Sequence, residues 1–337
     1  MKILIVGAGF SGSVIARELA EKGCKVEIID KRDHIGGNAY DYLNEQNIRI
    51  HKYGPHFFHT NNVQVYDFLS KFTEWVPYQH KAKAMLDNGE LVTIPVNQET
   101  KLRVGENNIV ETFIRPYTEK MWGMKLEQID PQIINRVPIR NDEIDLYFPN
   151  DQFQCMPKDG YTQLFSNLLN HPNIILSLNT PFSKTLESKF DHIFNSMPID
   201  EYHNYCFGHL NYRSIKFHTL TLPIPRLFPV VQVNFVNTGK YTRIIEWKNI
   251  PGQSFNNLFT TVTYEEPCDY KENNEQRFYP VKDLKGENKK IYDQYKSIKL
   301  DKVTFIGRLG QYVYLDMHQC VSSALIIAKN FINEKNL

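Results

Sequence analysis

The feature that most constrains the fold is a glycine-rich turn between two apolar runs at the start of the chain. Residues 2–6, KILIV, form a continuous apolar run that is typical of a strand buried on both faces. The turn, GAGFSG at 7–12, leads into residues 13–23, whose apolar spacing and terminal glycine predict a helix. Residues 25–30, KVEIID, predict a second strand that ends in an acid. This strand, GxGxxG turn, helix and strand together make the dinucleotide-binding fingerprint in its structural context.

Each glycine of the turn has a physical role in such a unit. Gly7 permits the tight turn, Gly9 lets the backbone approach a pyrophosphate, and Gly12 lets the helix pack closely on the strand. The helix N-terminus faces the phosphates because its N–H groups favour negative charge. Asp30, at the end of the second strand, is placed to bind a ribose hydroxyl. We therefore predict a bound dinucleotide in a Rossmann-type α/β lobe.

The residues after the second strand bear on the choice between NAD and FAD, which the fingerprint alone leaves open. The stretch KRDHIGGNAY, residues 31–40, places Lys31 shortly before the pair Gly36 and Gly37, and Asn38 follows them. This arrangement resembles FAD-binding proteins of the amine-oxidase-like class, in which a second loop contacts the cofactor and the chain then descends toward the flavin ring. The resemblance favours FAD and implies that these four residues contact it.

The composition argues against nucleic acids and membranes as partners. The 337 residues carry 39 basic and 38 acidic side chains, whereas a nucleic-acid-binding face usually shows as a basic excess. The opening MKILIVGAGF is too short an apolar run for a signal peptide or a membrane span. The five cysteines are scattered without a CxxC pair, as expected of reduced thiols. We therefore predict a cytoplasmic protein with neither kind of partner.

The rest of the chain predicts elements inserted between two parts of one lobe. Apolar spacing predicts helices at 62–74, 107–122, 160–170 and 317–332, a hairpin at 82–96, strands at 173–179 and 302–307, and several strands within 211–265. The last strand and helix restore the α/β pattern of the first forty residues. The sequence therefore predicts a discontinuous Rossmann-type lobe, an inserted small helical lobe and an antiparallel β-sheet substrate lobe.

Three histidines lie close together in HKYGPHFFHT, residues 51–60, and raise the question of a metal site. His51, His56 and His59 have no fourth ligand nearby in the sequence, whereas a tetrahedral site needs ligands at short, regular spacing. We therefore predict no metal, and the cluster needs another explanation.

Several further motifs follow the order of one known family. They are HIGGNAY (34–40), HKYGPHFFHT (51–60), PYTEKMWG (116–123), RVPIR (136–140), DGYTQLF (159–165), YRSIKF (212–217), YTRIIEWK (241–248) and GRLGQYVYLDMHQ (307–319). Over almost its whole length the chain closely resembles bacterial UDP-galactopyranose mutases. The resemblance implies an isomerase that interconverts UDP-galactopyranose and UDP-galactofuranose and uses FAD, which must be reduced although there is no net redox change.

The chemistry that the resemblance implies explains why the flavin must be reduced. Ring contraction requires the sugar to open while its anomeric carbon is held. In the implied mechanism flavin N5 attacks that carbon, UDP leaves, and the opened sugar recloses through its 4-hydroxyl in place of its 5-hydroxyl. Only reduced flavin has an electron-rich N5, so reduction is a chemical necessity.

The resemblance also assigns residues to the flavin. It implies that the histidine segment forms a wall of the isoalloxazine site, with His56 near N5 and His59 beside it. By the same match Arg308 lies beside the flavin. Asp316 and Met317 begin the final helix, whose N-terminal amides would face the flavin edge where reduction leaves negative charge. Asp316 is equally well explained as a simple helix N-cap.

A UDP-sugar carries a charged diphosphate, and arginine forks bind phosphate oxygens. By match, Arg136 lies on a loop that closes over the diphosphate and Arg243 is the second clamp, so both are implied in catalysis together with His56. Arg213 stands in a family motif as a further substrate contact, but an ordinary surface ion pair explains it equally well. The implied aromatic contacts are Tyr117 and Trp122 at the uracil, Tyr147 on the uridine side, and Tyr279 and Tyr314 at the phosphates.

One departure from the family concerns residues 97–116, which are several helices' worth shorter than in the bacterial enzymes. We therefore predict a reduced helical lobe at 97–135, and either a monomer or a dimer formed through a different surface from the family's. The FAD-binding domain is expected at 1–75, 156–206 and 296–337, and the substrate lobe at 76–96, 136–155 and 207–295.

Three alternatives stay open at this point. Relatives of the family accept UDP-N-acetylgalactosamine, and the sequence does not decide between the two sugars. A flavin amine oxidase or desaturase would share the fold class, but it should show a substrate tunnel without a diphosphate clamp. A catalytically inactive UDP-sugar-binding relative is the third alternative, although none of the motifs looks broken.

Overall fold

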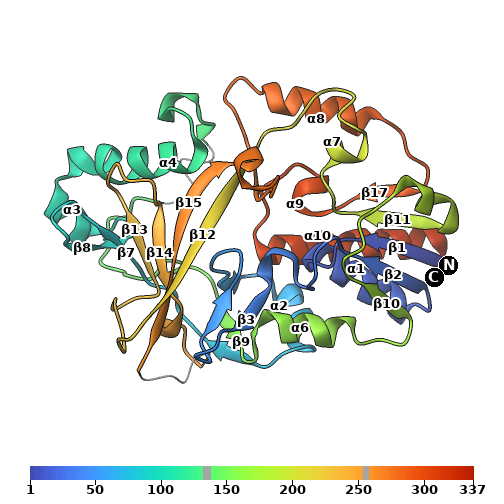
Figure 1. The fold of residues 1–337 in the computed structure, drawn as a ribbon, viewed down its shortest axis with the longest axis horizontal. Helices are drawn as coiled ribbons and strands as arrows, with labels where there is room; N and C mark the ends of the chain where they lie inside the picture. Colours follow the sequence, from blue (N-terminus) through green and yellow to red (C-terminus); the bar gives the residue numbers. More distant parts are fainter. Residues whose placement is uncertain (132–137, 253–257) are drawn as a thin grey trace.

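One end of the molecule is built on a parallel sheet whose strands follow the order β10-β2-β1-β11-β17 (Figure 1). The computed structural model describes residues 1–131, 138–252 and 258–337. The strands of this sheet are β1 (Lys2–Val6), β2 (Lys25–Ile29), β10 (Ile174–Ser177), β11 (His192–Asn195) and β17 (Val303–Phe305). The last strand of the chain thus joins the sheet of the first two, which confirms the predicted discontinuous Rossmann-type lobe.

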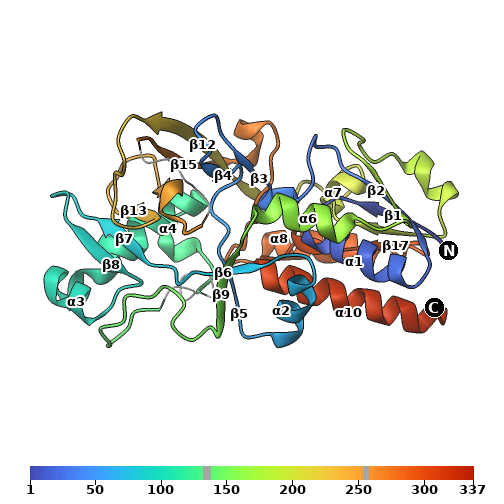
Figure 2. The same cartoon turned by 90° about the horizontal axis from the view of Figure 1, so that it is seen from below.

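Both faces of this sheet are covered, as the uninterrupted apolar run of β1 predicts. On one face Ile3 and Ile5 pack in a core with helices α1 (Phe10–Glu21), α6 (Gly160–Leu169) and α10 (Met317–Lys335). Figure 2 shows α1 and α10 beneath the strands. On the other face Leu4 and Val6 pack with Phe190. Successive residues of a strand point to opposite faces, so burial on both faces stabilises it.

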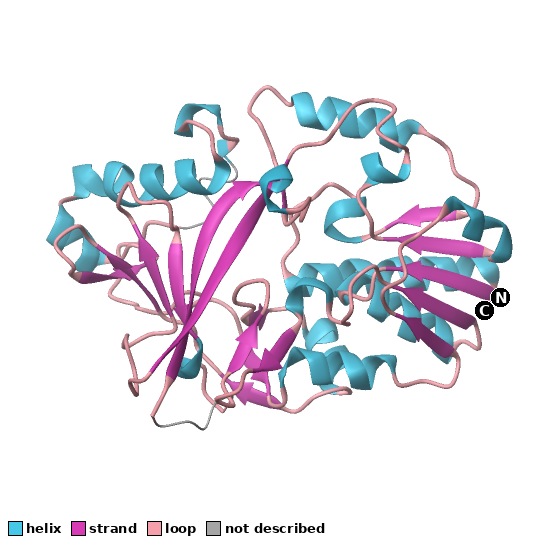
Figure 3. Cartoon of the chain, viewed as in Figure 1, coloured by secondary structure: helices cyan, strands magenta, loops and turns pink. Residues whose placement is uncertain are grey.

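The other end of the molecule is a larger sheet with the order β16-β12-β15-β14-β13-β7-β8, drawn in magenta at the left of Figure 3. Its strands are β7 (Ala82–Met85), β8 (Leu91–Ile94), β12 (Tyr212–Leu222), β13 (Gln232–Phe235), β14 (Arg243–Glu246), β15 (Thr260–Asp269) and β16 (Tyr279–Pro280). Neighbouring strands are antiparallel except β13 and β7, which run parallel. The predicted antiparallel sheet is therefore mixed, because the β7–β8 hairpin comes from an earlier part of the chain and adds to the edge beside β13.

Short helices lie against one end of the larger sheet (Figure 1). They are α3 (Gln98–Val104), a π-helical turn (Val110–Ile114) and α4 (Arg115–Trp122). Ile109 and Phe113 pack with Val92 and Ile94 of β8 and with Val236. These helices therefore share a core with the sheet instead of forming one of their own, as expected of a reduced helical lobe.

Two small sheets lie between the ends. In one, β3 (Asp41–Leu43) pairs with β4 (Arg49–His51); in the other, β9 (Phe153–Pro157) lies between β5 (Phe58–Thr60) and β6 (Trp75–Pro77). The other α-helices of the described residues are α2 (Val63–Ser70), α7 (Ile199–Tyr202), α8 (Glu287–Ser297) and α9 (Gly307–Gly310). No helix within the three described ranges is long and apolar enough to cross a membrane.

Candidate active site

A cleft of about 590 Å³ gathers most of the side chains that the sequence indicated. Its lining comes from the second glycine loop, the histidine segment, α4, β14, β16 and the start of α10. The fold therefore brings together segments that are far apart in the sequence. The predicted residues in the lining are Asn38, His56, His59, Tyr117, Trp122, Tyr147, Arg243, Tyr279, Arg308, Tyr314, Asp316 and Met317.

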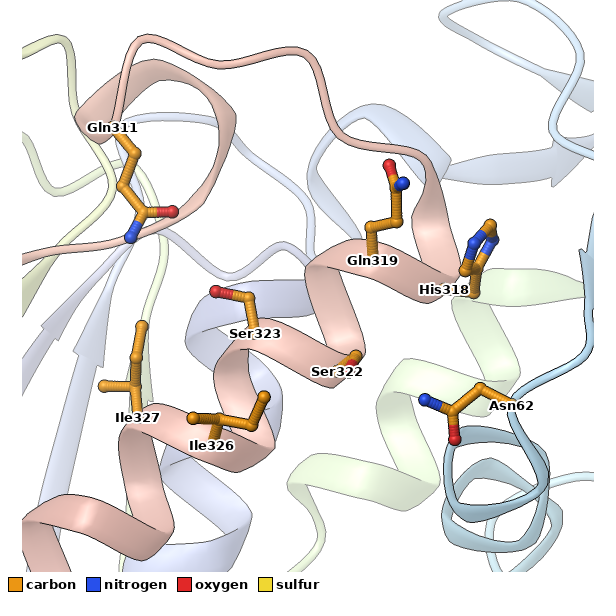
Figure 4. Close-up of a pocket in the computed structure, with 8 residues that line it drawn as sticks. All are labelled: Asn62, Gln311, His318, Gln319, Ser322, Ser323, Ile326 and Ile327. Carbon is orange, nitrogen blue, oxygen red and sulfur yellow. The ribbon is translucent and has the colours of Figure 1, made fainter.

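A second pocket, of about 470 Å³, lies along α10, where Ile326 is 57% exposed. Figure 4 shows its side chains along α10, with Asn62 across from His318. Of the described residues that were predicted for the site, none lines this pocket. We therefore take the larger cleft as the candidate active site.

The glycine turn forms a cradle that side chains would fill. Gly7 has φ +101°, a conformation reserved for glycine, and a Cβ atom at Gly12 would lie 2.0 Å from the Gly7 carbonyl oxygen. A Cβ atom at Gly37 would lie 2.9 Å from the Cα of Gly9, so the second glycine loop, in which Gly36 also has positive φ, lies against the first. The N-cap of α1 is Gly9, which makes no side-chain hydrogen bond to the first amides of the helix. These amides fit the pyrophosphate of a dinucleotide.

The acid at the end of β2 is tied to the glycine turn. Asp30 Oδ2 accepts a hydrogen bond from the Ala8 amide at 2.8 Å, and Oδ1 accepts one from the Arg32 amide at 2.9 Å. A carboxylate oxygen can accept a second hydrogen bond, so a ribose hydroxyl can still bind there. Lys31 is exposed, whereas Arg32 donates through Nη1 to Asn38 Oδ1 at 3.0 Å. Arg32 is therefore the basic side chain that contacts a cleft-lining residue, whereas the sequence indicated Lys31.

The surroundings of His56 fix its neutral form. Its Nδ1–H donates to the Gly54 carbonyl oxygen at 2.8 Å, since a carbonyl can only accept. Burial, the neighbouring His51 and the cations of Arg308 and Arg243 lower the pKa of His56 to about 3. At neutral pH Nε2 of His56 therefore carries a lone pair, and the ring presents a hydrogen-bond acceptor.

The other two histidines have protein partners. His59 Nδ1 lies 2.5 Å from Asp151 Oδ2, and its ring stacks on Phe148 with the centroids 3.6 Å apart. His51 is buried, and its Nδ1 accepts a hydrogen bond from the His56 amide at 3.1 Å. Within the described ranges, no group of three or more His, Cys, Asp or Glu side chains could hold a metal ion. Two of the three histidines line the cleft, and the third supports them from behind.

A buried ion pair lies in the cleft lining. Arg243 Nε donates to Glu265 Oε2 at 2.6 Å, and Glu265 is only 1% exposed. Burial opposes the charge of Arg243, but Glu265 beside it raises the pKa of Arg243 above its ordinary value, so the guanidinium stays protonated. A Cβ atom at Gly54, which has φ +85°, would lie 2.9 Å from Glu265 Oε1, so the histidine segment passes directly beside this carboxylate. The pair holds the Arg243 guanidinium in place in the cleft lining, where it can bind an anionic ligand.

Two phenols and an arginine stack beside the start of α10. The Tyr279 and Tyr314 rings lie 5.7 Å apart at 11°, and the Arg308 guanidinium lies 4.9 Å from the Tyr314 centroid. Arg308 donates through Nη2 to the Leu315 carbonyl at 2.5 Å and through Nη1 to the Phe278 carbonyl at 3.3 Å. Burial raises the pKa of Tyr279 to about 12, so this phenol keeps its proton.

Asp316 is the N-cap of α10, as the alternative explanation predicts. Its backbone amide donates to Gln319 Oε1 at 2.8 Å, which is half of a capping box. Asp316 and Met317 also line the cleft. A capping role and a place beside a cofactor are therefore compatible.

Helix α4 carries Tyr117 and Trp122 into the cleft lining, and two cations hold it there. Lys120 Nζ donates to three backbone carbonyls, at 2.9, 2.8 and 2.9 Å; they belong to Phe235 at the end of β13 and to Asn237 and Tyr241 before β14. Arg213 Nε donates to the Met121 carbonyl at 2.8 Å. Arg213 thus satisfies the C-terminal end of α4 and is not in the cleft lining, so its position supports a structural role in place of the expected substrate contact.

One predicted site residue lies outside the described part of the chain, and several residues of the cleft were not predicted. Arg136 lies within 132–137, outside the described residues. The polar residues of the cleft that no motif reasoning indicated are His80, Gln232, Asn234 and Glu265. Three of them lie on strands of the larger sheet, and the register of those strands was the missing information.

The Lys120 clamp predicts a change of substrate binding with pH. Burial lowers the pKa of Lys120 to about 8. Above that pH the amine has two protons for three carbonyls, so we expect α4 to loosen and KM for the substrate to rise. Lys120→Met, which cannot donate, should show the raised KM at every pH. Kinetics across the alkaline range provide the measurement, and a wild-type KM that stays flat would contradict the clamp.

The thermal stability should rise over the same pH range in which substrate binding weakens. Because the pKa of Lys120 is lowered on folding, the unfolded chain holds this proton more tightly than the folded chain does. The free energy of unfolding therefore rises with pH between about 8 and the ordinary lysine value. A rise in KM without a fall in melting temperature separates loosening of α4 from general unfolding.

The fold and the cleft define a class of protein. A Rossmann-type glycine cradle leads through Asn38 into a cleft lined by a neutral histidine and a partly buried arginine, as in an enzyme that uses a dinucleotide cofactor on an anionic substrate. A family model described as UDP-galactopyranose mutase matches residues 112–314, and one described as an NAD(P)-binding Rossmann-like domain matches residues 5–72. The chain belongs to the UDP-galactopyranose mutase family, which is a family of isomerases, and this membership implies a flavin cofactor.

Individual relatives cover almost the whole chain. A Klebsiella pneumoniae protein named "Probable UDP-galactopyranose mutase" is 34% identical over 371 residues, which cover 98% of this chain and 94% of the relative. A dTDP-fucopyranose mutase of Escherichia coli is also 34% identical, over 98% of both chains. A crystal structure of reduced UDP-galactopyranose mutase has a TM-score of 0.74 at 14% identity and covers 98% of this chain and 94% of its own, which supports the fold.

Proposed function

We propose that this chain interconverts UDP-galactopyranose and UDP-galactofuranose with reduced FAD as its cofactor. The observation that carries the proposal is the meeting, in one cleft, of Asn38 from the second glycine loop, His56 from the histidine segment and Arg243 from β14. A flavin held at one end and a diphosphate held at the other would bring the reacting atoms together between them. The family membership and the similarity to the K. pneumoniae relative support this substrate.

The glycine cradle supports FAD. The turn at Gly7 and Gly9 and the N-terminus of α1 would hold the pyrophosphate, and Asp30 would hold a ribose hydroxyl. The start of α10 would favour the negative charge of the reduced ring, because a helix N-terminus carries partial positive charge. When bound, reduced flavin supplies a nucleophilic nitrogen for the anomeric carbon of the sugar.

The substrate side of the cleft supports an anionic nucleotide sugar. Arg243 would bind the diphosphate and stabilise the charge that develops as UDP leaves. Tyr279 and Tyr314 would donate to phosphate oxygens, and Nε2 of His56 would accept a hydrogen bond from a sugar hydroxyl. Arg136, which lies outside the described residues, is proposed to lie on a loop that closes over the diphosphate, with Arg243 as the second clamp. The remaining proposed contacts are Tyr117, Trp122 and Tyr147 on the uridine side.

A second candidate substrate is dTDP-fucopyranose, because the E. coli mutase that acts on it is as similar to this chain as the K. pneumoniae relative is. UDP-N-acetylgalactosamine is the alternative that the sequence left open. We expect the highest kcat/KM with UDP-galactopyranose when the reduced protein is assayed against all three. A preference for another sugar nucleotide would change the substrate but not the mechanism.

The experiment that tests the mechanism compares oxidation states. We expect the purified protein to carry FAD, identified by its absorbance and its release on denaturation, and to be inactive until that flavin is reduced. Turnover by fully oxidised protein, with reductant rigorously excluded, would overturn the proposal. Turnover after reduction with dithionite, without net consumption of reductant, supports it.

We further propose a cytoplasmic enzyme with three domains. All five cysteines are free thiols in the structure, which supports a reducing compartment. The proposed FAD domain comprises 1–75, 156–206 and 296–337, the helical lobe 97–135, and the substrate lobe 76–96, 136–155 and 207–295. Helix α8 (Glu287–Ser297) runs across the boundary at 295, so that junction falls within its last turn.

The short helical lobe predicts a monomer, or a dimer formed through another surface. The alignment with the K. pneumoniae relative spans 371 positions against the 337 residues here, so the relative carries segments that this chain lacks. Light scattering at micromolar concentration gives the mass. If a dimer forms, Val110→Glu, at a position 41% exposed on the helical lobe, should leave it intact. Dissociation by that substitution would show that the helical lobe still forms the interface.

A further inference from the structure

A row of polar side chains runs from Tyr78, behind the cleft, into the cleft lining. Tyr78 Oη lies 2.9 Å from His80 Nδ1, and Gln232 Nε2 donates to Asn234 Oδ1 at 2.9 Å. His80, Gln232 and Asn234 line the cleft, whereas Tyr78 does not. His80 is 2% exposed and Gln232 is 4% exposed, so their polar atoms depend on one another for hydrogen bonds. The row joins the segment before β7 to β13. Figure 1 shows the two strands β7 and β13 side by side.

The proton on the Tyr78 hydroxyl decides which atoms donate and which accept along this row. Burial raises the pKa of Tyr78, so the hydroxyl keeps its proton. His80 Nδ1 is the only hydrogen-bond partner of this hydroxyl among the described residues. The hydroxyl therefore donates to Nδ1, because the reverse direction would leave its proton without a protein acceptor. Burial and the charge of Arg243 lower the pKa of His80 to about 3, so the neutral ring carries its one proton on Nε2.

The same order of donors and acceptors extends to the Gln232 side chain. The Gln232 side chain lies against His80 and its hydrogen bonding raises the pKa of His80, although no well-formed hydrogen bond reaches Nε2 among the described residues. The Gln232 amide nitrogen donates to Asn234, so its carbonyl oxygen is the group of that side chain left to accept from the Nε2–H of His80. Asn234 Oδ1 is then occupied, which leaves the two protons of Asn234 Nδ2 for the cleft.

We propose that Tyr78, His80 and Gln232 are positioning residues whose hydrogen bonds make Asn234 present amide donors to an acceptor oxygen of the nucleotide. The inference rests on the proposed function, since it assumes a nucleoside-diphosphate ligand. Asn234 is paired with Arg243 across β13 and β14, so both side chains project from the same face of the sheet. Donors side by side suit an oxygen of the base or of the diphosphate. His56 has the opposite tautomer and presents an acceptor, so the cleft offers both kinds of group.

The test measures UDP binding to the oxidised holoenzyme by calorimetry. Asn234→Ala should weaken UDP binding by about 2- to 12-fold, the range for one net hydrogen bond. Tyr78→Phe removes only a hydroxyl outside the cleft lining, and Gln232→Met removes the amide at nearly constant length; both should weaken binding within the same range. In the Asn234→Ala background, neither substitution should weaken UDP binding further, because their effect acts through Asn234.

Controls separate this effect from general damage. Tyr202→Phe removes a comparable tyrosine hydrogen bond, to Glu187 at 2.8 Å in the parallel-sheet lobe, and should leave UDP affinity unchanged. Flavin content and melting temperature are recorded for every variant. Nitrogen NMR of histidine-labelled protein should find the His80 proton on Nε2 in the wild type, and more of the Nδ1–H tautomer in Tyr78→Phe.

The outcomes are distinguishable. If uridine binding weakens in Asn234→Ala and inorganic pyrophosphate binding does not, the acceptor oxygen belongs to the base; the reverse assigns it to the diphosphate. Full additivity of Tyr78→Phe with Asn234→Ala, or a wild-type His80 proton on Nδ1, would overturn the inference. Failure of the wild-type holoenzyme to bind UDP would instead overturn the proposed function.

Discussion

Replacing Arg243 with alanine is expected to lower kcat/KM by about 10- to 150-fold while the protein keeps its flavin. On the proposed assignment of Arg243, the substitution removes a charge-assisted contact to the diphosphate, worth about 1.5–3 kcal/mol. Arg243 lies on β14 of the larger sheet and not in the glycine cradle, so FAD binding should be unaffected. Turnover of the reduced variant and the absorbance of its flavin are the two measurements. Arg136→Ala should show the same pattern if Arg136 also binds the diphosphate.

The same substitution should destabilise the fold, because it leaves Glu265 buried without its partner. Breaking a buried ion pair in this way costs about 3–5 kcal/mol. Burial raises the pKa of Glu265, and loss of Arg243 removes the opposing charge, so the carboxyl takes up a proton more readily. A folded-state pKa above the unfolded value gives stability that is present at low pH and is lost as pH rises through it. The stability deficit of the variant should therefore be smallest in acid.

Two further variants separate charge from structure. Arg243→Met combined with Glu265→Gln removes both charges and should recover stability but not activity. Arg277→Ala is the control, because Arg277 is a buried arginine that pairs with Glu201 at 2.8 Å, yet does not line the cleft. It should lose stability and keep UDP affinity. Normal turnover by Arg243→Ala would show that the clamp is assigned to the wrong residue.

The parts of the fold that could be predicted from the sequence are those set by local patterns. The run at 2–6 shows burial on both faces, and the glycines of 7–12 specify a turn that other residues could not adopt. The confirmed hairpin at 82–96 likewise follows from alternation around a turn. Each of these depends on residues that are neighbours in the chain, so the sequence displays the cause directly.

The parts that could not be predicted depend on register between distant strands. The parallel pairing of β13 with β7 brings Gln232 opposite Ala82 and so close to His80, and nothing in either segment shows this. Glu265 reaches Arg243 because β15 pairs with β14 at that position. Arg213 stands in a recognisable motif, but only the location of the α4 C-terminus shows that its guanidinium is already used there. A motif identifies a residue, whereas the tertiary structure decides what that residue contacts.

The glycine cradle leads to the second prediction of large effect, that Gly9→Ala binds FAD poorly without unfolding. A Cβ atom at Gly9 would have Gly37 Cα as its nearest neighbour at 3.6 Å, an ordinary van der Waals distance, and φ is −87°, which alanine adopts readily. The protein without cofactor should therefore tolerate the change. The added methyl group would occupy the space that the pyrophosphate needs, at a cost of about 1–3 kcal/mol, or about 5- to 150-fold in FAD affinity.

Gly12→Ala provides the comparison that makes the Gly9 result specific. Its Cβ atom would lie 2.0 Å from the Gly7 carbonyl oxygen and 2.9 Å from Cγ2 of Ile5, so α1 could no longer pack on β1 at its present distance. We expect this variant to lose both FAD affinity and thermal stability. Cofactor-free Gly9→Ala should instead have the same melting temperature as the cofactor-free wild-type protein. Flavin-to-protein ratios and melting curves of the cofactor-free proteins distinguish the two. Full flavin content in Gly9→Ala would show that the turn does not approach the pyrophosphate. A Gly9→Ala protein that melts as low as Gly12→Ala would instead show that Gly9 is required by the fold itself.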